Sequence, residues 1–330
     1  MKQQTYTIKT PECFNLKDIF TCGQCFRWQQ NEDNSYTGIV KENVINIKQN
    51  EKNIIIKSIG KDNIQELTTQ YFDLNRDYKK IQNKLSQIDE NMRVSIKYGQ
   101  GIRLLNQDLW ETLISFIISA NNNIPRIQKI IQRLSEAYGK AIEFEGKTYY
   151  TFPTPEELKD VTIETYRNLG LGFRDKRIYE TTQKILNKEV DLHALEQNSN
   201  THKVRETLLT LPGVGPKVAD CILLFSTLKR LEVFPIDVWV NRVMNELYIH
   251  GDENKISKKQ IETIARQKFG DLAGLAQQYL FYWRRENWLT GGVPSGTVLF
   301  GTFWPTGSVS VPNGSNCPKK HRPRWDTPKN

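Results

Sequence analysis

The residues with the clearest capacity for covalent chemistry are Lys217 and Asp237, which stand twenty positions apart. Lys217 follows the sequence Leu211-Pro212-Gly213-Val214-Gly215-Pro216 and falls in the first turn of a predicted helix. The helix dipole opposes a cation at this end, so we expect the neutral amine to be favoured. A neutral amine is the form of lysine that makes a Schiff base.

Asp237 follows Pro235 and Ile236 and begins another predicted amphipathic helix. A lone aspartate at such a position is usually only a helix N-cap. Its position downstream of a glycine-containing hairpin and a lysine favours a catalytic carboxylate instead. We therefore predict that Lys217 and Asp237 share one site.

Two apolar helical runs flank Gly213, Val214 and Gly215 within the stretch Leu208–Leu228. The two glycines permit a positive φ and leave no Cβ in the path of a ligand, and Pro216 suits the first position of a helix. Successive backbone amides at the positive end of a helix form an anion site. Because the chain has a formal net charge of +9, the predicted anion is a nucleic-acid phosphate.

Length and cysteine usage limit the class of protein. The chain of 330 residues is long enough for two or three domains, and it shows neither a secretory pattern at its start nor an apolar run that could span a membrane. Its cysteines are Cys13, Cys22, Cys25, Cys221 and Cys317. Cys22 and Cys25 have the spacing of half a zinc site or of a redox pair, but no second pair follows, so we expect neither role. We expect a reduced, cytoplasmic protein with no membrane partner.

The apolar patterns predict strands first and helices afterwards. Residues 1 to about 60 contain β-branched runs such as Asn53–Ile56 between turn-rich segments, which predicts an antiparallel meander. Helices are predicted at Asp62–Asp73 and Tyr78–Ile88, and from about Gly101 the helical period continues without a break. The order of elements predicts an α+β fold.

Residues 288–330 differ in composition from everything before them. They are rich in proline and glycine and contain no isoleucine, whereas the preceding chain is rich in isoleucine, lysine and asparagine. We expect a poorly ordered tail, and the abrupt change is consistent with a non-native origin such as a frameshift.

Four further stretches occur in order around the hairpin and Asp237. They are Gly23–Trp28, Ser119–Ile127, Leu169–Arg174 and Ala276–Phe281. With the hairpin, they resemble the 8-oxoguanine DNA glycosylases of the helix-hairpin-helix Gly/Pro…Asp (HhH-GPD) superfamily, from about residue 10 to residue 287. The resemblance implies an N-terminal antiparallel β-sheet domain (TBP-like) over residues 1–100. An all-α helix-hairpin-helix glycosylase core over residues 101–287 and the tail 288–330 would follow it.

This resemblance implies a bifunctional DNA glycosylase and AP lyase of base excision repair that removes 8-oxoguanine opposite cytosine. Lys217 would attack the sugar C1′, form a Schiff base and cut the strand by β-elimination, while Asp237 supports the reaction electrostatically. The expected partner is double-stranded DNA with an oxidised purine, bound by a nucleoid-associated monomer of bacterial or archaeal type. No catalytic metal or redox cofactor is expected, although relatives suggest a structural monovalent cation at the hairpin carbonyls of Pro212–Val214.

By the same resemblance, the damaged base would be flipped from the duplex into a pocket formed by Gly23, Cys221, Gln277 and Phe281. The carbonyl of Gly23 would accept the hydrogen on N7 that 8-oxoguanine has and guanine lacks. Normal guanine would place two acceptors face to face, at a cost of roughly 1–3 kcal/mol. Gln277 would bond the Watson–Crick edge, and Phe281 and Cys221 would cover the two faces.

Flipping leaves an unpaired cytosine and a gap in the duplex. The resemblance assigns recognition of the cytosine to Asn121, Arg126 and Arg174, whose amide and guanidinium groups suit its Watson–Crick edge. Phe173 would wedge into the gap, where most relatives carry tyrosine. Relatives of the eukaryotic type often have histidine at the position of Trp239, near a phosphate, so this contact is in doubt here.

Two other functions stay open from the sequence. One is a glycosylase for an oxidised pyrimidine or an alkylated purine. Lys217 argues against the alkylpurine branch, and the segment Gly23–Trp28 argues against the oxidised-pyrimidine branch. The other is a noncatalytic helix-hairpin-helix DNA-binding module, which needs neither Lys217 nor Asp237 and leaves the cytosine-reading residues unexplained.

Covalent trapping tests the predicted nucleophile. Borohydride added to the protein with a lesion-containing duplex should reduce the Schiff base and leave a stable protein–DNA adduct. Lys217→Gln should abolish this adduct on a denaturing gel. An adduct that survives the substitution would remove Lys217 from the mechanism.

Overall fold

The computed structural model describes residues 1–252 and 255–289. The predicted tail of residues 288–330 therefore lies outside the described residues, apart from its first two positions. Those two positions belong to helix α14 (Ala273–Leu289). The predicted division into 1–100, 101–287 and 288–330 stays a prediction.

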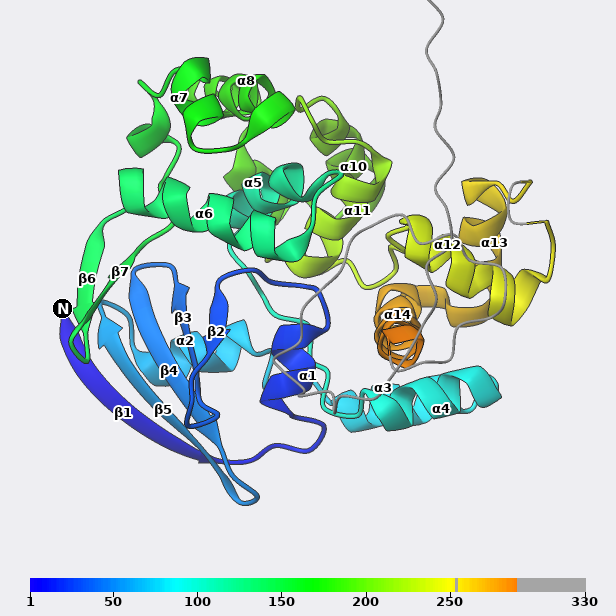
Figure 1. The fold of residues 1–330 in the computed structure, drawn as a ribbon. Coiled ribbons are helices and arrows are strands. Elements are labelled where there is room, and N and C mark those ends of the chain that lie inside the picture. The colour runs from blue at the N-terminus through cyan, green and yellow to red at the C-terminus, as the bar shows by residue number, and fades with distance from the viewer. Residues whose placement is uncertain (253–254, 290–330) are drawn as a thin grey trace, which may run out of the picture.

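A five-stranded antiparallel sheet forms the N-terminal part of the fold (Figure 1). Its strands are β1 (Lys2–Lys9), β2 (Trp28–Gln30), β3 (Tyr36–Val40), β4 (Asn43–Gln49) and β5 (Asn53–Gly60). Their order is β1-β5-β4-β3-β2, so β2 to β5 form the predicted meander and β1 pairs with the free edge of β5. Ile47 of β4 pairs with Ile56 of β5, and both side chains are buried.

Two short helices cover the buried face of the sheet. Helix α2 (Ile64–Tyr71) lies within the predicted helix, whereas α1 (Leu16–Thr21) lies in a region for which only strands were predicted. Asn15 caps α1 by accepting from the amide of Asp18, and apolar side chains at three- and four-residue spacing turn inward. Phe20 of α1 stacks on Trp28 with their ring centroids 4.2 Å apart.

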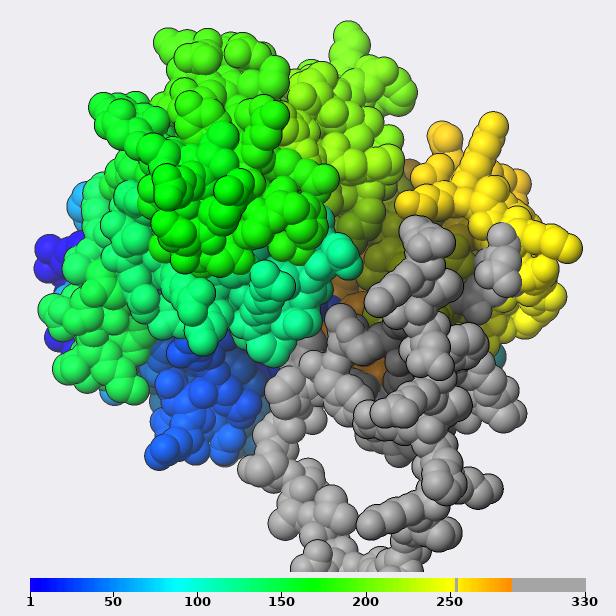
Figure 2. Space-filling view, turned by 45° about the horizontal axis from the view of Figure 1, so that its top comes forward, coloured from blue at the N-terminus to red at the C-terminus, as the bar shows by residue number. Residues whose placement is uncertain are grey.

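Helices dominate the rest of the chain and gather into two masses (Figure 1). They are α3 (Tyr78–Ser86), α4 (Glu90–Tyr98), α5 (Leu109–Ser119), α6 (Ile124–Tyr138), α7 (Ile163–Asn168), α8 (Asp175–Leu186), α9 (Leu192–Gln197), α10 (Thr201–Leu209), α11 (Pro216–Phe225), α12 (Val238–Met244) and α13 (Lys258–Phe269), before α14. Figure 2 shows residues 109–216, coloured teal to light green, and residues 238–270, coloured yellow, with a recess between them. Sheet followed by helices confirms the predicted α+β class.

A β-hairpin interrupts the helical region, so the expectation of an unbroken helical period from Gly101 was wrong. Strands β6 (Ala141–Phe144) and β7 (Lys147–Tyr150) pair across a two-residue turn. Both turn residues, Glu145 and Gly146, have positive φ, as tight hairpin turns require. The strands are four residues each, too short for their alternation to stand out against the flanking helices.

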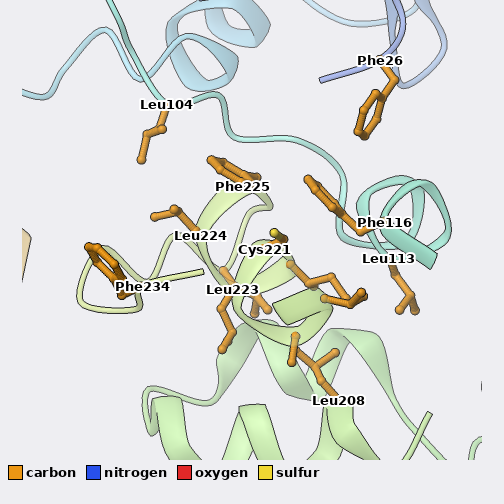
Figure 3. Packing of buried hydrophobic residues seen from close by; sticks show 14 of the residues in the cluster. Phe26, Leu104, Leu113, Phe116, Leu208, Cys221, Leu223, Leu224, Phe225 and Phe234 are labelled. Carbon is orange, nitrogen blue, oxygen red and sulfur yellow. The ribbon is translucent and has the colours of Figure 1, made fainter. Parts of the chain in front are cut away.

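The helical core centres on the packing of α5 against α11. Figure 3 shows Phe116 of α5 beside Phe225 and Cys221 of α11. The rings of Phe116 and Phe225 stack with their centroids 5.7 Å apart. Helix α4 runs beside α14, so the N-terminal region also supports the last described helix (Figure 1). None of the helices within the described ranges has the length and apolar character that a membrane crossing needs.

Gln24 joins the loop after α1 to the linker before α5. Its side chain is fully buried, and its amide nitrogen donates to the carbonyls of Ile19 and Arg103, each at 2.8 Å. Its amide oxygen accepts from the backbone amide of Leu105 at 2.8 Å. These bonds fix the backbone next to Gly23, which the sequence places at the lesion.

Replacing Gln24 with Met should destabilise the protein while keeping the side-chain volume. The two carbonyls and the amide left without partners cost about 1–3 kcal/mol each, so we expect the free energy of unfolding to fall by at least about 3 kcal/mol. Urea denaturation measures the change. Gln30→Met, on the exposed end of β2, is the control and should be nearly neutral; equal losses from the two variants would refute the assignment.

Candidate active site

Lys217 lies at the mouth of helix α11, which begins at Pro216 and has Gly215 as its N-cap. Its ammonium nitrogen stands 5.3 Å from the centre of the Phe116 ring and forms a side-chain hydrogen bond with Cys221, one helical turn further on. The side chain is half-buried. Lys217 is therefore held on a wall of the core without being sealed from solvent.

Asp237 is the N-cap of helix α12, and its Oδ1 accepts a hydrogen bond from the amide of Val240 at 2.8 Å. Asp237 therefore has the helix-capping role that is usual for an aspartate at this position. Asp237 also lies close enough to Lys217 to act on its charge. The cap fixes the carboxylate on a helix end, so its negative charge stays near the amine.

The protonation of Lys217 differs from the prediction. Burial lowers its pKa, but the negative charges of Cys221 and Asp237 raise it, and the net direction is upward. Burial raises the pKa of Cys221 to about 11, so this thiol is uncharged near pH 7 and Asp237 is the anion that matters there. The net direction therefore does not support the expected neutral amine in the free protein, because the groups around Lys217 together outweigh its burial.

The hairpin has the predicted positive φ at Gly213 but not at Gly215, whose φ of −89° is that of an ordinary helix N-cap. Gly213 has a φ of 87°, the amide of Val214 donates to the carbonyl of Leu211 at 3.1 Å, and Thr181 donates its hydroxyl to the carbonyl of Pro212 at 3.0 Å. Within the described residues, the amides of Gly213 and Gly215 donate to no backbone carbonyl. These two amides are therefore available to an anion at the start of α11.

Gly23, Gln277 and Phe281 lie at one place although they come from opposite ends of the chain. Gly23 has a φ of 91°, and a Cβ on it would stand 3.5 Å from Cε1 of Phe281. Gln277 is buried, and its Oε1 has no hydrogen-bond partner among the described residues. An orphaned buried oxygen is costly unless a ligand satisfies it.

The hollow beside these residues is narrow. It encloses about 150 Å³ of empty space, has no room for a water molecule, and is lined by Phe234, Val240, Val243, Met244, Gln277, Leu280 and Phe281. A purine can enter only if some of these side chains move. Cys221 contacts Lys217, but no described contact joins it to Phe281, so a base sandwiched between Cys221 and Phe281 stays a prediction.

Helix α14 is tied to the loop that carries Gly23. Gln278 donates to the carbonyl of Cys22, Arg285 donates to the carbonyl of Thr21 at 2.6 Å, and the Tyr282 hydroxyl donates to Asp18 at 3.3 Å. The loop that carries Gly23 is therefore fixed to the helix that carries Gln277 and Phe281. Burial raises the pKa of Cys22 to about 12, and burial also raises the pKa of Cys25, so neither thiol is a ready metal ligand.

Arg174 is already engaged in the free protein. Its guanidinium donates to the carbonyls of Ala120, Asn121 and Leu171, which uses four of the five N–H groups of an arginine. Asn121 has a φ of 51°, and this loop is held in place by those bonds. Arg174 therefore positions Asn121 and keeps one N–H for a cytosine, which is fewer than the forked contact that the sequence predicted.

Phe173 and Arg126 are exposed beside this loop. Phe173 is 54% exposed, with the Arg174 guanidinium 4.2 Å from its ring centre. Arg126 lies on α6, and its Nη2 is 4.0 Å from where a Cβ on Gly172 would stand. Trp239, next to Asp237, is 36% exposed and lies under the Arg242 guanidinium. The predicted wedge and one predicted cytosine reader thus reach solvent on one face.

Sequence analysis did not single out Phe116, Arg177 or Arg285 as site residues. Phe116 is one of several apolar residues at helical spacing in α5. That spacing does not show which aromatic ring faces Lys217. Arg285 reaches Gly23 from α14, with its Nη1 3.6 Å from the position of a Cβ on that glycine. The sequence did offer one signal for Arg285. It follows Gln277 and Phe281 at a regular four-residue spacing, which places all three on one face of the helix.

Comparisons with known proteins cover most of the described chain. A family model described as the N-terminal domain of 8-oxoguanine DNA glycosylase matches residues 7–113. A second, described as HhH-GPD superfamily base excision DNA repair protein, matches residues 114–270. The two matches meet at the middle of α5, next to Phe116.

Named relatives agree with these matches. A probable N-glycosylase/DNA lyase of Methanothermobacter thermautotrophicus is 34% identical over 254 residues, covering 71% of this chain and 79% of the relative. The N-glycosylase/DNA lyase of Saccharomyces cerevisiae is 32% identical, covering 86% of each chain. The 8-oxoguanine glycosylase/lyase of Clostridium acetobutylicum, solved with duplex DNA containing cytosine opposite 8-oxoguanine, is 43% identical. It superposes with a TM-score of 0.81 over 87% of this chain and 97% of that one.

The charge on Asp237 should set the pH at which Lys217 becomes nucleophilic. Asp237 stabilises the ammonium, so Asp237→Asn should lower the Lys217 pKa and move the midpoint of trapping to lower pH by about one unit. Asparagine caps helices equally well, so α12 should persist. The measurement is the rate of cyanoborohydride trapping on a duplex with a preformed abasic site, as a function of pH.

Asp191→Asn is the control for this experiment. Asp191 caps helix α9 as Asp237 caps α12, but it is not among the described charges that act on Lys217, so its substitution should leave the midpoint unchanged. A midpoint that stays fixed or rises in Asp237→Asn would contradict the assignment of Asp237 as the anion that holds the proton on Lys217.

Proposed function

We infer the function of this chain from its family: it belongs to the 8-oxoguanine DNA glycosylases of the HhH-GPD superfamily of base excision DNA repair proteins. It is a DNA glycosylase and AP lyase, and double-stranded DNA is its partner. The observation in the structure that carries this function is the placement of Lys217 beside Asp237 at the end of the phosphate-binding hairpin.

The reaction begins with a proton leaving Lys217. In the free protein the ammonium is favoured, so binding of the substrate must remove this proton or displace the charge that holds it. The neutral amine then attacks the sugar C1′, and the bond from C1′ to the base nitrogen breaks. The electron pair of that bond leaves with the base, which takes up a proton.

Strand cleavage follows from the covalent link. Opening of the sugar ring gives a protonated Schiff base between Lys217 and C1′, which acidifies the hydrogen on C2′. Loss of that proton drives β-elimination and breaks the bond from C3′ to its oxygen. Water then hydrolyses the Schiff base and returns Lys217 as an amine. The steps use groups of this chain, the DNA and water.

Asp237 is proposed to place a negative charge beside the reacting sugar. As the base leaves, positive charge develops on the sugar, and a carboxylate fixed at the N-terminus of α12 opposes that charge in place. Its bond to the Val240 amide keeps it oriented without making it a proton donor. This arrangement supports an electrostatic role for Asp237.

Lesion recognition is proposed to use Gly23 and Gln277, which both lie beside Phe281. The carbonyl of Gly23 is proposed to accept the N7 hydrogen of 8-oxoguanine, and the orphaned Oε1 of Gln277 is proposed to accept a hydrogen from the Watson–Crick edge. Because the hollow beside Gln277 has no room even for water, entry of the base must displace apolar side chains around Phe281. In this proposal the base supplies the hydrogen-bond donor that the Gln277 Oε1 lacks in the free protein.

Discrimination of the opposite base is proposed to depend chiefly on Arg126. Arg174 has a single N–H left after holding the Asn121 loop, whereas Arg126 is exposed at the start of α6. Action as a monomer stays a prediction. The hairpin carbonyls, among which that of Pro212 already accepts from Thr181, are the proposed ligands of a structural monovalent cation.

A panel of duplexes tests the substrate and the opposite base together. Single-turnover base release should be faster for 8-oxoguanine than for thymine glycol or an alkylated adenine, and faster with cytosine opposite than with adenine. Arg126→Met should reduce the preference for cytosine by roughly tenfold, because a bidentate pair contributes about 1–3 kcal/mol of discrimination. Lys129→Met, one turn along α6, is the control. A faster reaction on thymine glycol would move the protein to another branch of the superfamily.

A further inference from the structure

Arg177 of α8 lies between the two parts of the protein that are assigned to face DNA. Its Cβ and Cδ are 3.2 and 3.1 Å from where a Cβ on Gly213 would stand, so its stem packs directly on the hairpin glycine. Its guanidinium carbon lies 5.2 Å from the centre of the Phe173 ring. One side chain thus spans from the phosphate-binding hairpin to the exposed wedge.

The charge of Arg177 has no counterion in residues 1–252 and 255–289. The side chain is exposed, and among the described residues no carboxylate lies within ion-pair distance of it. The acids on the same helix are already paired, since Asp175 accepts from Arg167 at 2.8 Å and Glu180 lies 3.6 Å from Lys176. An exposed arginine next to paired neighbours is available to an external anion.

Arg126, Arg174 and Arg177 lie close enough for their charges to interact. Burial lowers the pKa of Arg174, and the cations of Arg126 and Arg177 lower it further. Like charges held together raise the energy of the free protein and are relieved when an anion binds. Of the three, Arg174 is committed to backbone carbonyls, so the exposed pair carries the available charge.

We propose that Arg177 binds a DNA phosphate beside the gap that Phe173 enters, and so joins the wedge to the hairpin. Its planar guanidinium suits bidentate contact with phosphate oxygens, and its stem is anchored on a loop whose free amides face the same polyanion. A contact of this kind positions the duplex and carries no sequence information. The inference rests on the proposed function, because it takes duplex DNA as the ligand of Gly213–Gly215.

The salt dependence of DNA binding tests this contact. Each phosphate neutralised by a cation contributes about −0.9 to the slope of log K against log salt concentration, so Arg177→Met should make the slope less negative by about 0.9. Methionine keeps the stem that packs on Gly213. Binding should weaken roughly tenfold at low salt, by the same factor for an undamaged duplex and for a duplex with 8-oxoguanine opposite cytosine. The lesion duplex is measured in a Lys217→Gln background to prevent cleavage.

Two matched variants complete the experiment. Arg177→Lys keeps the charge and should keep the slope, and Arg93→Met removes the same charge from the remote helix α4 and should also keep it. An unaltered slope in Arg177→Met would overturn the proposal. Weaker binding with an unaltered slope would overturn it too, because lost packing on Gly213 would then explain the defect.

The proposed function is checked separately on the unmodified protein. Failure of that protein to release 8-oxoguanine would refute the substrate assignment. The slopes on undamaged duplex would still decide whether Arg177 takes a phosphate.

Discussion

The electrostatic interaction between the Lys217 amine and the Asp237 carboxylate is the constraint on which the rest of the structure depends. Lys217 stands at the start of α11 and Asp237 at the start of α12, so two helix ends must be held together for the charges to meet. The packing of Phe116 against Phe225 fixes the first of these ends within the core. A shift of either helix would separate the nucleophile from the charge that controls its proton.

Much of the site could be predicted because its signals are local. The glycines of the hairpin, the position of Lys217 and the helix start at Asp237 are each readable from a few neighbouring residues. The protonation of Lys217 could not be predicted, because the balance between its burial and the effects of Cys221 and Asp237 depends on distances that the sequence does not give. The hydrogen bonding of Arg174 could not be predicted either, because most of its donors bind carbonyls more than fifty positions earlier.

The sheet and most helices followed from periodicity, and the exceptions share a physical cause. Strands β6 and β7 and helix α1 are short, so their patterns span too few residues to outweigh the neighbouring signal. The narrowness of the hollow beside Gln277 also could not be predicted, but for a different reason. Whether side chains fill a space depends on packing between distant segments, which residue spacing does not encode.

The bonds between α14 and the loop at Thr21–Gly23 have a consequence for biosynthesis. Gln278 and Cys22 are 256 positions apart, so the wall that reads the base can close only after nearly the whole chain has left the ribosome. Helix α12, which Asp237 caps, also packs against α14, so the carboxylate near Lys217 gains its support at the same late stage. The two ends of the chain therefore complete this part of the fold together.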